Sequence, residues 1–171
     1  KLAGYFKDNS KLLDISSPGI RNCQRGAFYA TMAHFSRSDA PCLIALPTGS
    51  GKTALMMALC FGLEVSRALL ITPATILRHQ AYQKFSTLEG LTNAKAIPED
   101  LSKPKIMEAL HEFKEAEDWQ ACEDSDIVLA TPNITSSQYR RVTDPPGEIF
   151  YTLFLDEAYH SPADSWTQLI N

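Results

Sequence analysis

The sequence lacks the features that mark membrane proteins, disulfide-rich secreted proteins and disordered chains. Its 171 residues contain no apolar run near the roughly 18 residues of a membrane span, no signal peptide and no internal repeat. It has only four cysteines, and none of them forms a C-x-x-C pair. This spacing argues against a zinc site and a disulfide framework, and it fits a reducing cytoplasm. With 44% hydrophobic and 21% charged residues, the composition is that of one soluble globular domain.

The chain has no strong excess of either charge, because it contains 16 Lys and Arg residues and 20 Asp and Glu residues, which give a net charge of -4. The distribution is uneven: residues 1–97 hold 11 basic and 5 acidic residues, whereas residues 98–171 hold 5 and 15. The basic first half is suited to a nucleic-acid-binding face. An unevenly charged solvated surface is the alternative that charge alone leaves open. The chain begins with Lys1 rather than Met, so we expect it to be a piece of a longer protein.

Short apolar runs alternate with helical patterns after a polar lead-in at residues 1–19. The runs predict strands at 42–46, 67–72, 94–97, 126–131 and 151–155. The intervening patterns predict helices at 20–35, 53–63, 74–85 and 132–139, and a turn at 144–147. Strands that alternate with helices indicate an α/β fold, in which helices cover both faces of a parallel sheet.

The acidic segment after residue 97 departs from this alternation. Ile106, Leu110 and Phe113 recur at helical spacing, which predicts an amphipathic helix over residues 104–119. Such a helix either packs its apolar stripe on the domain or docks a partner.

The sequence Pro47–Thr53 (PTGSGKT) stands between an apolar run and a helical pattern. Its glycines let the backbone curl so that successive N–H groups point at phosphate oxygens. Lys52 can reach the β- and γ-phosphates, and the Thr53 hydroxyl can bind Mg²⁺. The pattern G-x-x-x-x-G-K-[ST] has glycine at its first position, where this sequence has Leu46. We interpret this segment as a phosphate-binding loop (P-loop).

A second apolar run ends in two carboxylates, Asp156 and Glu157. In a parallel sheet such residues lie at the carboxyl edge, where ligands of α/β proteins bind. Asp156 is suited to the Mg²⁺ shell, and Glu157 is suited to orient and deprotonate a water molecule. A metal site formed with His160 is the alternative.

Together these motifs resemble the first RecA-like domain of superfamily 2 helicases and translocases. Within that superfamily, the chain is most similar to the DEAD/DEAH-box branch that contains type III restriction-enzyme helicase subunits. The resemblance covers residues 20–171, with motif I at 47–53 and motif II at 156–160. Residues 20–24 (IRNCQ) resemble the element upstream of motif I, whose glutamine reads the adenine edge in the family. The resemblance implies that these residues bind the nucleotide: Arg21, Gln24, Thr48, Gly49, Ser50, Gly51, Lys52 and Thr53.

Two further segments resemble the nucleic-acid-binding motifs Ia and Ib, at residues 71–80 and 130–133. Each places a strand end, a hydroxyl group and a helix start together, a geometry suited to phosphate. An ordinary strand-to-helix turn is the alternative for each. The resemblance implies nucleic-acid contacts from Thr72, Pro73, Arg78, Gln80, Thr131, Pro132 and Asn133. Motif II departs from the family pattern at its fourth position, where Tyr159 replaces histidine.

The resemblance implies a RecA-like P-loop NTPase domain that uses ATP and Mg²⁺ and acts on single-stranded or duplex nucleic acid, DNA rather than RNA. The expected function is an ATP-dependent DNA helicase or translocase, in restriction or phage defence, with Lys52 and Glu157 as catalytic residues. An RNA helicase and a nucleotide-dependent switch are the alternatives. Because no segment resembles the second RecA-like domain, we expect these 171 residues alone to be nearly inactive.

Overall fold

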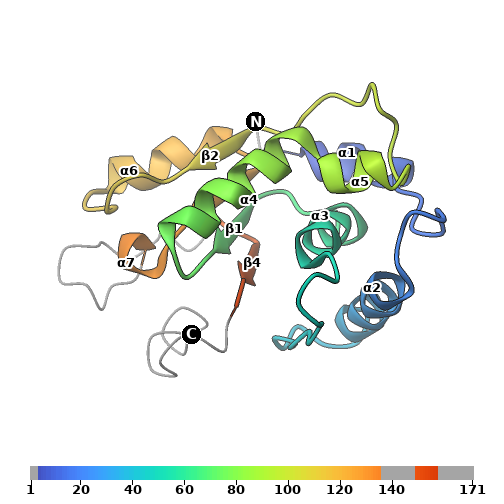
Figure 1. The fold of residues 1–171 in the computed structure, drawn as a ribbon. Coiled ribbons are helices and arrows are strands. Elements are labelled where there is room, and N and C mark those ends of the chain that lie inside the picture. Colours follow the sequence, from blue (N-terminus) through green and yellow to red (C-terminus); the bar gives the residue numbers. More distant parts are fainter. Residues whose placement is uncertain (1–3, 136–148, 158–171) are drawn as a thin grey trace.

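The domain is built on a parallel sheet of four strands, in the order β2-β3-β1-β4 (Figure 1). The computed structural model describes residues 4–135 and 149–157. The strands are β1 (Ala68–Ile71), β2 (Ile106–Glu108), β3 (Ile127–Ala130) and β4 (Thr152–Leu155). Every neighbouring pair is parallel, and Ala68 stands in register with both Ile127 and Thr152. The predicted parallel α/β sheet is confirmed.

Helices connect the strands. The α-helices are α1 (Tyr5–Asp8), α2 (Asn22–Phe35), α3 (Lys52–Gly62), α4 (Thr75–Thr87), α5 (Glu89–Asn93), α6 (Ala116–Gln120) and α7 (Pro132–Thr135). Two short 3₁₀ helices, η1 (Ser10–Leu12) and η2 (Ala121–Asp124), complete the set within the described residues. In this part of the chain, no helix is long and apolar enough to cross a membrane.

Alternate residues of the central strands face two separate cores, because side chains of a strand point to opposite faces. Ala68 and Leu70 join the larger core, to which α1 through α5 contribute buried side chains. Leu69 and Ile71 join the smaller core, which contains Trp119 of α6 and Ile134 of α7. Helices therefore cover both faces of the sheet, as predicted.

The N-terminal segment expected to be a polar lead-in forms α1 and η1, and Phe6 of α1 belongs to the larger core. Phe6 is fully buried, and its ring meets that of Phe61 edge-on at a centroid distance of 5.0 Å. Asp126 binds the backbone N–H of Tyr5 at 3.2 Å, which ties α1 to the start of β3. The segment therefore packs on the domain through the buried Phe6 and the partly buried Tyr5, Leu13 and Ile15.

Most predicted elements lie within about two residues of observed ones, but three predictions were wrong. Residues 41–47 form no strand, and Leu43 is 86% exposed. Residues 94–97 form a turn, because the N–H groups of Lys95 and Ala96 bond back to carbonyls of α5. The predicted turn at 144–147 and the end of the predicted helix at 132–139 lie outside the described residues.

The third wrong prediction is the amphipathic helix over 104–119. Its first part is β2, which pairs with β3, and its last part is α6. The pairing begins where Asp126 accepts the N–H of Lys105 at 2.8 Å. Since β3 offers an open edge at that point, backbone pairing outweighs the helical spacing of the apolar residues, and Leu110 is left 70% exposed.

Candidate nucleotide and nucleic-acid site

The sheet topology gathers the predicted motifs at one edge. β1, β3 and β4 are parallel, so their carboxyl ends share the edge where α/β proteins bind ligands. The N–H of Thr72 donates a hydrogen bond to the carbonyl of Ala130, and the N–H of Asp156 donates one to the carbonyl of Ile71 at 2.9 Å. Residues that are distant in sequence, from motifs Ia, Ib and II, therefore lie beside one another.

The loop before α3 has the conformation that a phosphate cradle requires. Gly49 and Gly51 have φ angles of 77° and 86°, in the left-handed region that glycine adopts without a steric penalty. Gly51 caps α3, and Lys52 is its first residue, so the helix N-terminus opens onto the loop. The Ser50 hydroxyl is buried and has no hydrogen-bond partner among the described residues. An unsatisfied buried hydroxyl in such a loop fits a missing phosphate oxygen.

The charged centre of the site joins the loop to the end of β4. Lys52 Nζ lies 2.8 Å from Glu157 Oε1, and their side chains are 30% and 21% exposed. Burial raises the pKa of Asp156 above its ordinary value, the Glu157 carboxylate raises it further, and the Lys52 ammonium opposes both. Two adjacent carboxylates in a partly desolvated site favour the binding of a cation.

Glu157 has a φ angle of 54°, which is uncommon for a residue with a side chain. Such conformations cost free energy and cluster at functional sites. Among the described residues, no group of three or more His, Cys, Asp or Glu side chains is placed to hold a metal by itself. His160, the further ligand of the alternative metal site, lies outside the described residues, as does Tyr159.

Arg21 and Gln24 contact the loop directly. Gln24 is 5% exposed; its Oε1 accepts the N–H of Arg21 at 2.9 Å, and its Nε2 donates to the carbonyl of Gly51 at 3.0 Å. The Arg21 guanidinium donates to the carbonyl of Gly49. A Cβ added to Gly51 would lie 2.3 Å from Gln24 Nε2, so a larger residue there would displace the Gln24 amide from the loop. The predicted adenine-reading glutamine thus fastens α2 to the loop.

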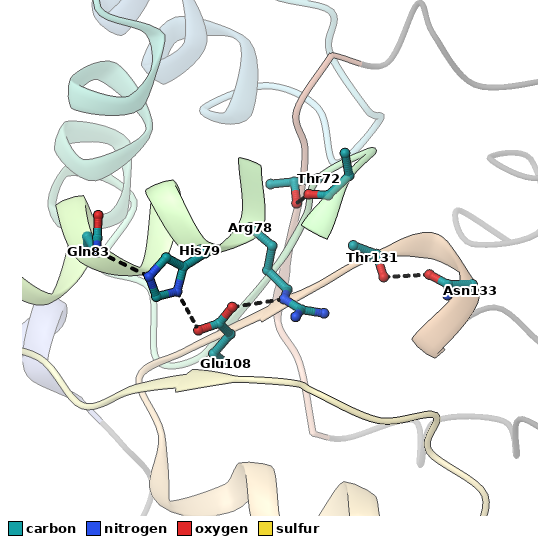
Figure 2. A network of polar contacts seen from close by, with 8 residues as sticks. Thr72, Arg78, His79, Gln83, Glu108, Thr131 and Asn133 are labelled. Carbon is teal, nitrogen blue, oxygen red and sulfur yellow. Dashed lines mark hydrogen bonds and ion pairs between the residues drawn. The ribbon is translucent and has the colours of Figure 1, made fainter. Parts of the chain in front are cut away.

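The predicted nucleic-acid contacts fall into exposed and buried groups. Gln80 and Asn133 are exposed, whereas Thr72, Arg78 and Thr131 are buried. Figure 2 shows Arg78 extending from α4 toward Thr131 and Asn133, whose side chains are hydrogen-bonded to each other. The structure therefore brings motifs Ia and Ib together but exposes only part of the predicted set.

Sequence reasoning missed Glu108, which lies in β2. Its Oε1 is 3.1 Å from Arg78 Nε, and its Oε2 is 3.2 Å from His79 Nδ1 (Figure 2). The Glu108 side chain is 14% exposed and that of Arg78 is 6% exposed, so the pair is largely desolvated. No motif signals this role, because it depends on β2 lying beside α4.

A cavity of about 300 Å³ adjoins the loop on the side of α5. Arg21, Gln24 and Gly51 form one side of it, and Gly90 and Asn93 of α5 form part of the other. Its volume is at the lower end of small-molecule pockets, which span roughly 300–1,000 Å³. It has room for part of a nucleotide next to the phosphate cradle.

A family model described as type III restriction enzyme, res subunit, matches residues 17–171. A search of curated proteins found no match.

Proposed function

The chain belongs to the type III restriction enzyme res subunit family, whose matched region is a helicase-type RecA-like domain, and on this premise we propose that it is the ATP-binding half of an ATP-dependent DNA helicase or translocase. One observation carries the proposal. Lys52 of the P-loop and Glu157 after β4 are 105 residues apart in sequence, and their side chains lie 2.8 Å apart. This contact supports the proposal, because it joins a cation suited to bind phosphate to a carboxylate suited to act on water.

ATP would bind with its phosphates on the loop. The backbone N–H groups at the start of α3 and the buried Ser50 hydroxyl would donate to phosphate oxygens. Mg²⁺, when bound, neutralises charge on the β- and γ-phosphates, and Thr53 and Asp156 would hold it. Thr48 and Gly49 would complete the cradle.

Lys52 would then exchange its partner. Its ammonium would move from Glu157 to the γ-phosphate, whose charge grows during hydrolysis. Glu157, released from the lysine, would orient a water molecule and accept its proton. Lys52 and Glu157 are therefore proposed as the catalytic residues.

Nucleic acid would bind along the edge formed by motifs Ia and Ib. Gln80 and Asn133 are exposed there, and Thr72, Pro73, Arg78, Thr131 and Pro132 would shape and support the contact surface. We favour DNA over RNA because the family takes its name from a restriction enzyme. A second RecA-like domain would complete the motor. It would supply an arginine that contacts the γ-phosphate and a second binding surface for the nucleic-acid strand.

The test is the steady-state ATPase of a longer protein that contains both domains, with single-stranded DNA, single-stranded RNA or neither. We expect stimulation by DNA, and we expect Glu157→Gln to bind ATP but lose at least about 100-fold in turnover, as for loss of a general base. Stimulation by RNA alone would favour an RNA helicase. ATP binding with no stimulation by either strand would favour a switch, and near-normal turnover of Glu157→Gln would remove that residue from catalysis.

A further inference from the structure

We propose that Glu108 of β2 is a positioning residue for nucleic-acid binding, because it fixes the Arg78 guanidinium in the orientation that receives a backbone phosphate. The inference rests on the proposed function, in which nucleic acid binds along the edge formed by motifs Ia and Ib and Arg78 belongs to the contact surface. Glu108 lies in none of the sequence motifs and reaches Arg78 from another element of the fold.

The Glu108 carboxylate holds Arg78 by the guanidinium nitrogen nearest to the aliphatic stem. Glu108 Oε1 accepts a hydrogen bond from Arg78 Nε at 3.1 Å, and no other acidic side chain among the described residues forms an ion pair with Arg78. This contact leaves Nη1 and Nη2 without a hydrogen-bond partner in the part of the chain that the structure describes. These two nitrogens form a planar fork that matches two oxygens of one phosphate.

The Arg78 side chain is only 6% exposed, and donor groups that are buried in proteins almost always have a partner. Figure 2 shows the guanidinium directed toward Thr131 and Asn133, which follow β3 at the carboxyl edge of the sheet. Neither of these side chains is charged. The Asn133 Oδ1 accepts from the Thr131 hydroxyl, so the amide N–H groups of Asn133 are left to donate. This arrangement of donors suits an anion.

Glu108 is itself fixed by its neighbours. Its Oε2 lies 3.2 Å from His79 Nδ1, and Gln83 Nε2 lies 3.1 Å from His79 Nε2 (Figure 2). Its backbone stands in register with Leu129 of β3. Because Arg78 and His79 are successive residues of α4, the carboxylate joins β2 to α4 through both of its oxygens. Such support is what a binding group needs in order to keep one orientation.

This geometry makes the length of the residue 108 side chain as important as its charge. Glutamate reaches Arg78 and His79 with one oxygen each. Aspartate is shorter by one methylene group, so it keeps the negative charge but cannot keep both contacts. Glutamine has the length of glutamate and an oxygen that can accept from Arg78 Nε, but it has no charge. The two substitutions therefore separate the orientation of Arg78 from the neutralisation of its charge.

The experiment measures the affinity of the 171-residue chain and its variants for a fluorescent oligothymidylate, by anisotropy at several salt concentrations. Arg78→Ala should weaken binding by roughly tenfold, and it should lower the slope of log affinity against log salt by about 0.7, as for the loss of one phosphate contact with a single strand. Glu108→Asp should weaken binding by about threefold to tenfold, because the fork is no longer held toward the strand. Glu108→Gln should bind at least as tightly as the unmodified chain, since it keeps the orientation and removes a nearby negative charge.

A double variant and a matched control sharpen the test. In the Arg78→Ala background, Glu108→Asp should change the affinity by less than about twofold, because the side chain that Glu108 positions is absent. Glu99→Asp makes the same substitution at an exposed position ahead of β2, and it should also change the affinity by less than about twofold. The affinity for Mg²⁺ and ATP, measured on the same samples, reports on the rest of the domain.

Failure of the proposed function and failure of the inference give different results. If the unmodified chain does not bind the oligonucleotide, both fail. If it binds, but Arg78→Ala or Glu108→Asp binds equally well, only the inference is overturned. An equal loss in Glu108→Gln and Glu108→Asp would assign the effect to charge, and a joint loss of ATP and oligonucleotide binding in Glu108→Asp would assign it to the stability of the fold. Either result would overturn the positioning role.

Discussion

At the scale of single residues, the loop before α3 combines local geometry with distant contacts. Gly49 and Gly51 adopt left-handed φ angles within a seven-residue segment, and Lys52 begins the helix that follows. Gln24 of α2 fastens this loop, and Glu108 of β2 holds Arg78 of α4, so elements that are distant in sequence fix these side chains.

Arg67 is likewise held by residues that are distant in sequence, and it carries a stability prediction. Its guanidinium is buried and donates to three backbone carbonyls, those of Ser125, Ile149 and Glu123. The three carbonyls are bonded by three different guanidinium nitrogens, and the single ammonium nitrogen of lysine cannot occupy all three places, so Arg67→Lys should lower the free energy of unfolding by about 2–4 kcal/mol. Urea denaturation measures the loss.

The matched control for this prediction is Arg37→Lys, at an exposed position. It should change the free energy of unfolding by no more than about 0.5 kcal/mol. Equal effects of the two substitutions would show that the three carbonyl contacts contribute nothing specific.

Tyr5 makes stability depend on pH in the alkaline range. Burial, followed by the Asp126 charge, raises its pKa to about 12, and its hydroxyl donates to the carbonyl of Ser102. In the unfolded chain the phenol ionises near pH 10, so between about pH 10 and 12 the folded state holds the extra proton. Stability should therefore fall as pH rises through this window.

Thermal unfolding at pH 9 and pH 11 checks the effect of Tyr5. The drop in Tm between the two values should be smaller in Tyr5→Phe, which has no phenolic proton to lose. An equal drop in both proteins would assign the alkaline loss to other groups.

At the scale of elements, the apolar runs of the sequence predicted strands correctly where another strand lies beside the run in the sheet. β1, β3 and β4 are paired in the sheet and were predicted within about one or two residues. Residues 42–46 have the same apolar character, yet in the structure no described strand pairs with them, so they form no regular secondary structure and stay largely exposed. Periodicity identifies a segment that is able to form a strand, and the neighbouring backbone decides whether it does.

Cysteine labelling tests this difference directly. Cys23 and Cys42 are exposed, whereas Cys60 and Cys122 are buried, and burial raises the pKa of the last two thiols well above the ordinary value. A maleimide at pH 7.5 should therefore label two thiols in the folded chain and four in urea, as counted by mass spectrometry. Protection of Cys42 in the folded chain would show that residues 42–46 are covered as the sequence predicted.

At the scale of the whole molecule, the parallel strands bring the carboxylate pair and the predicted nucleic-acid contacts to one edge of the sheet, and the contact of Lys52 with Glu157 brings the loop before α3 to the same edge. This arrangement unites motifs that are up to about a hundred residues apart, and it explains why their order in the sequence was informative while their contacts were not. The contribution of a second domain is still to be tested, since that domain would supply both the arginine and the second contact with the nucleic-acid strand.

The central claim is that the loop before α3 binds nucleotide through Lys52, and calorimetric titration with Mg²⁺ and ATP tests it most directly. The comparison includes the unmodified chain, Lys52→Ala and the control Lys11→Ala, at an exposed position of η1. Because Lys52 is the cation that we propose to bind the phosphates, Lys52→Ala should weaken ATP binding by at least about tenfold, the effect of roughly 1.4 kcal/mol. Lys11→Ala should bind as the unmodified chain does. Equal affinity for ATP in Lys52→Ala and the unmodified chain would contradict the account.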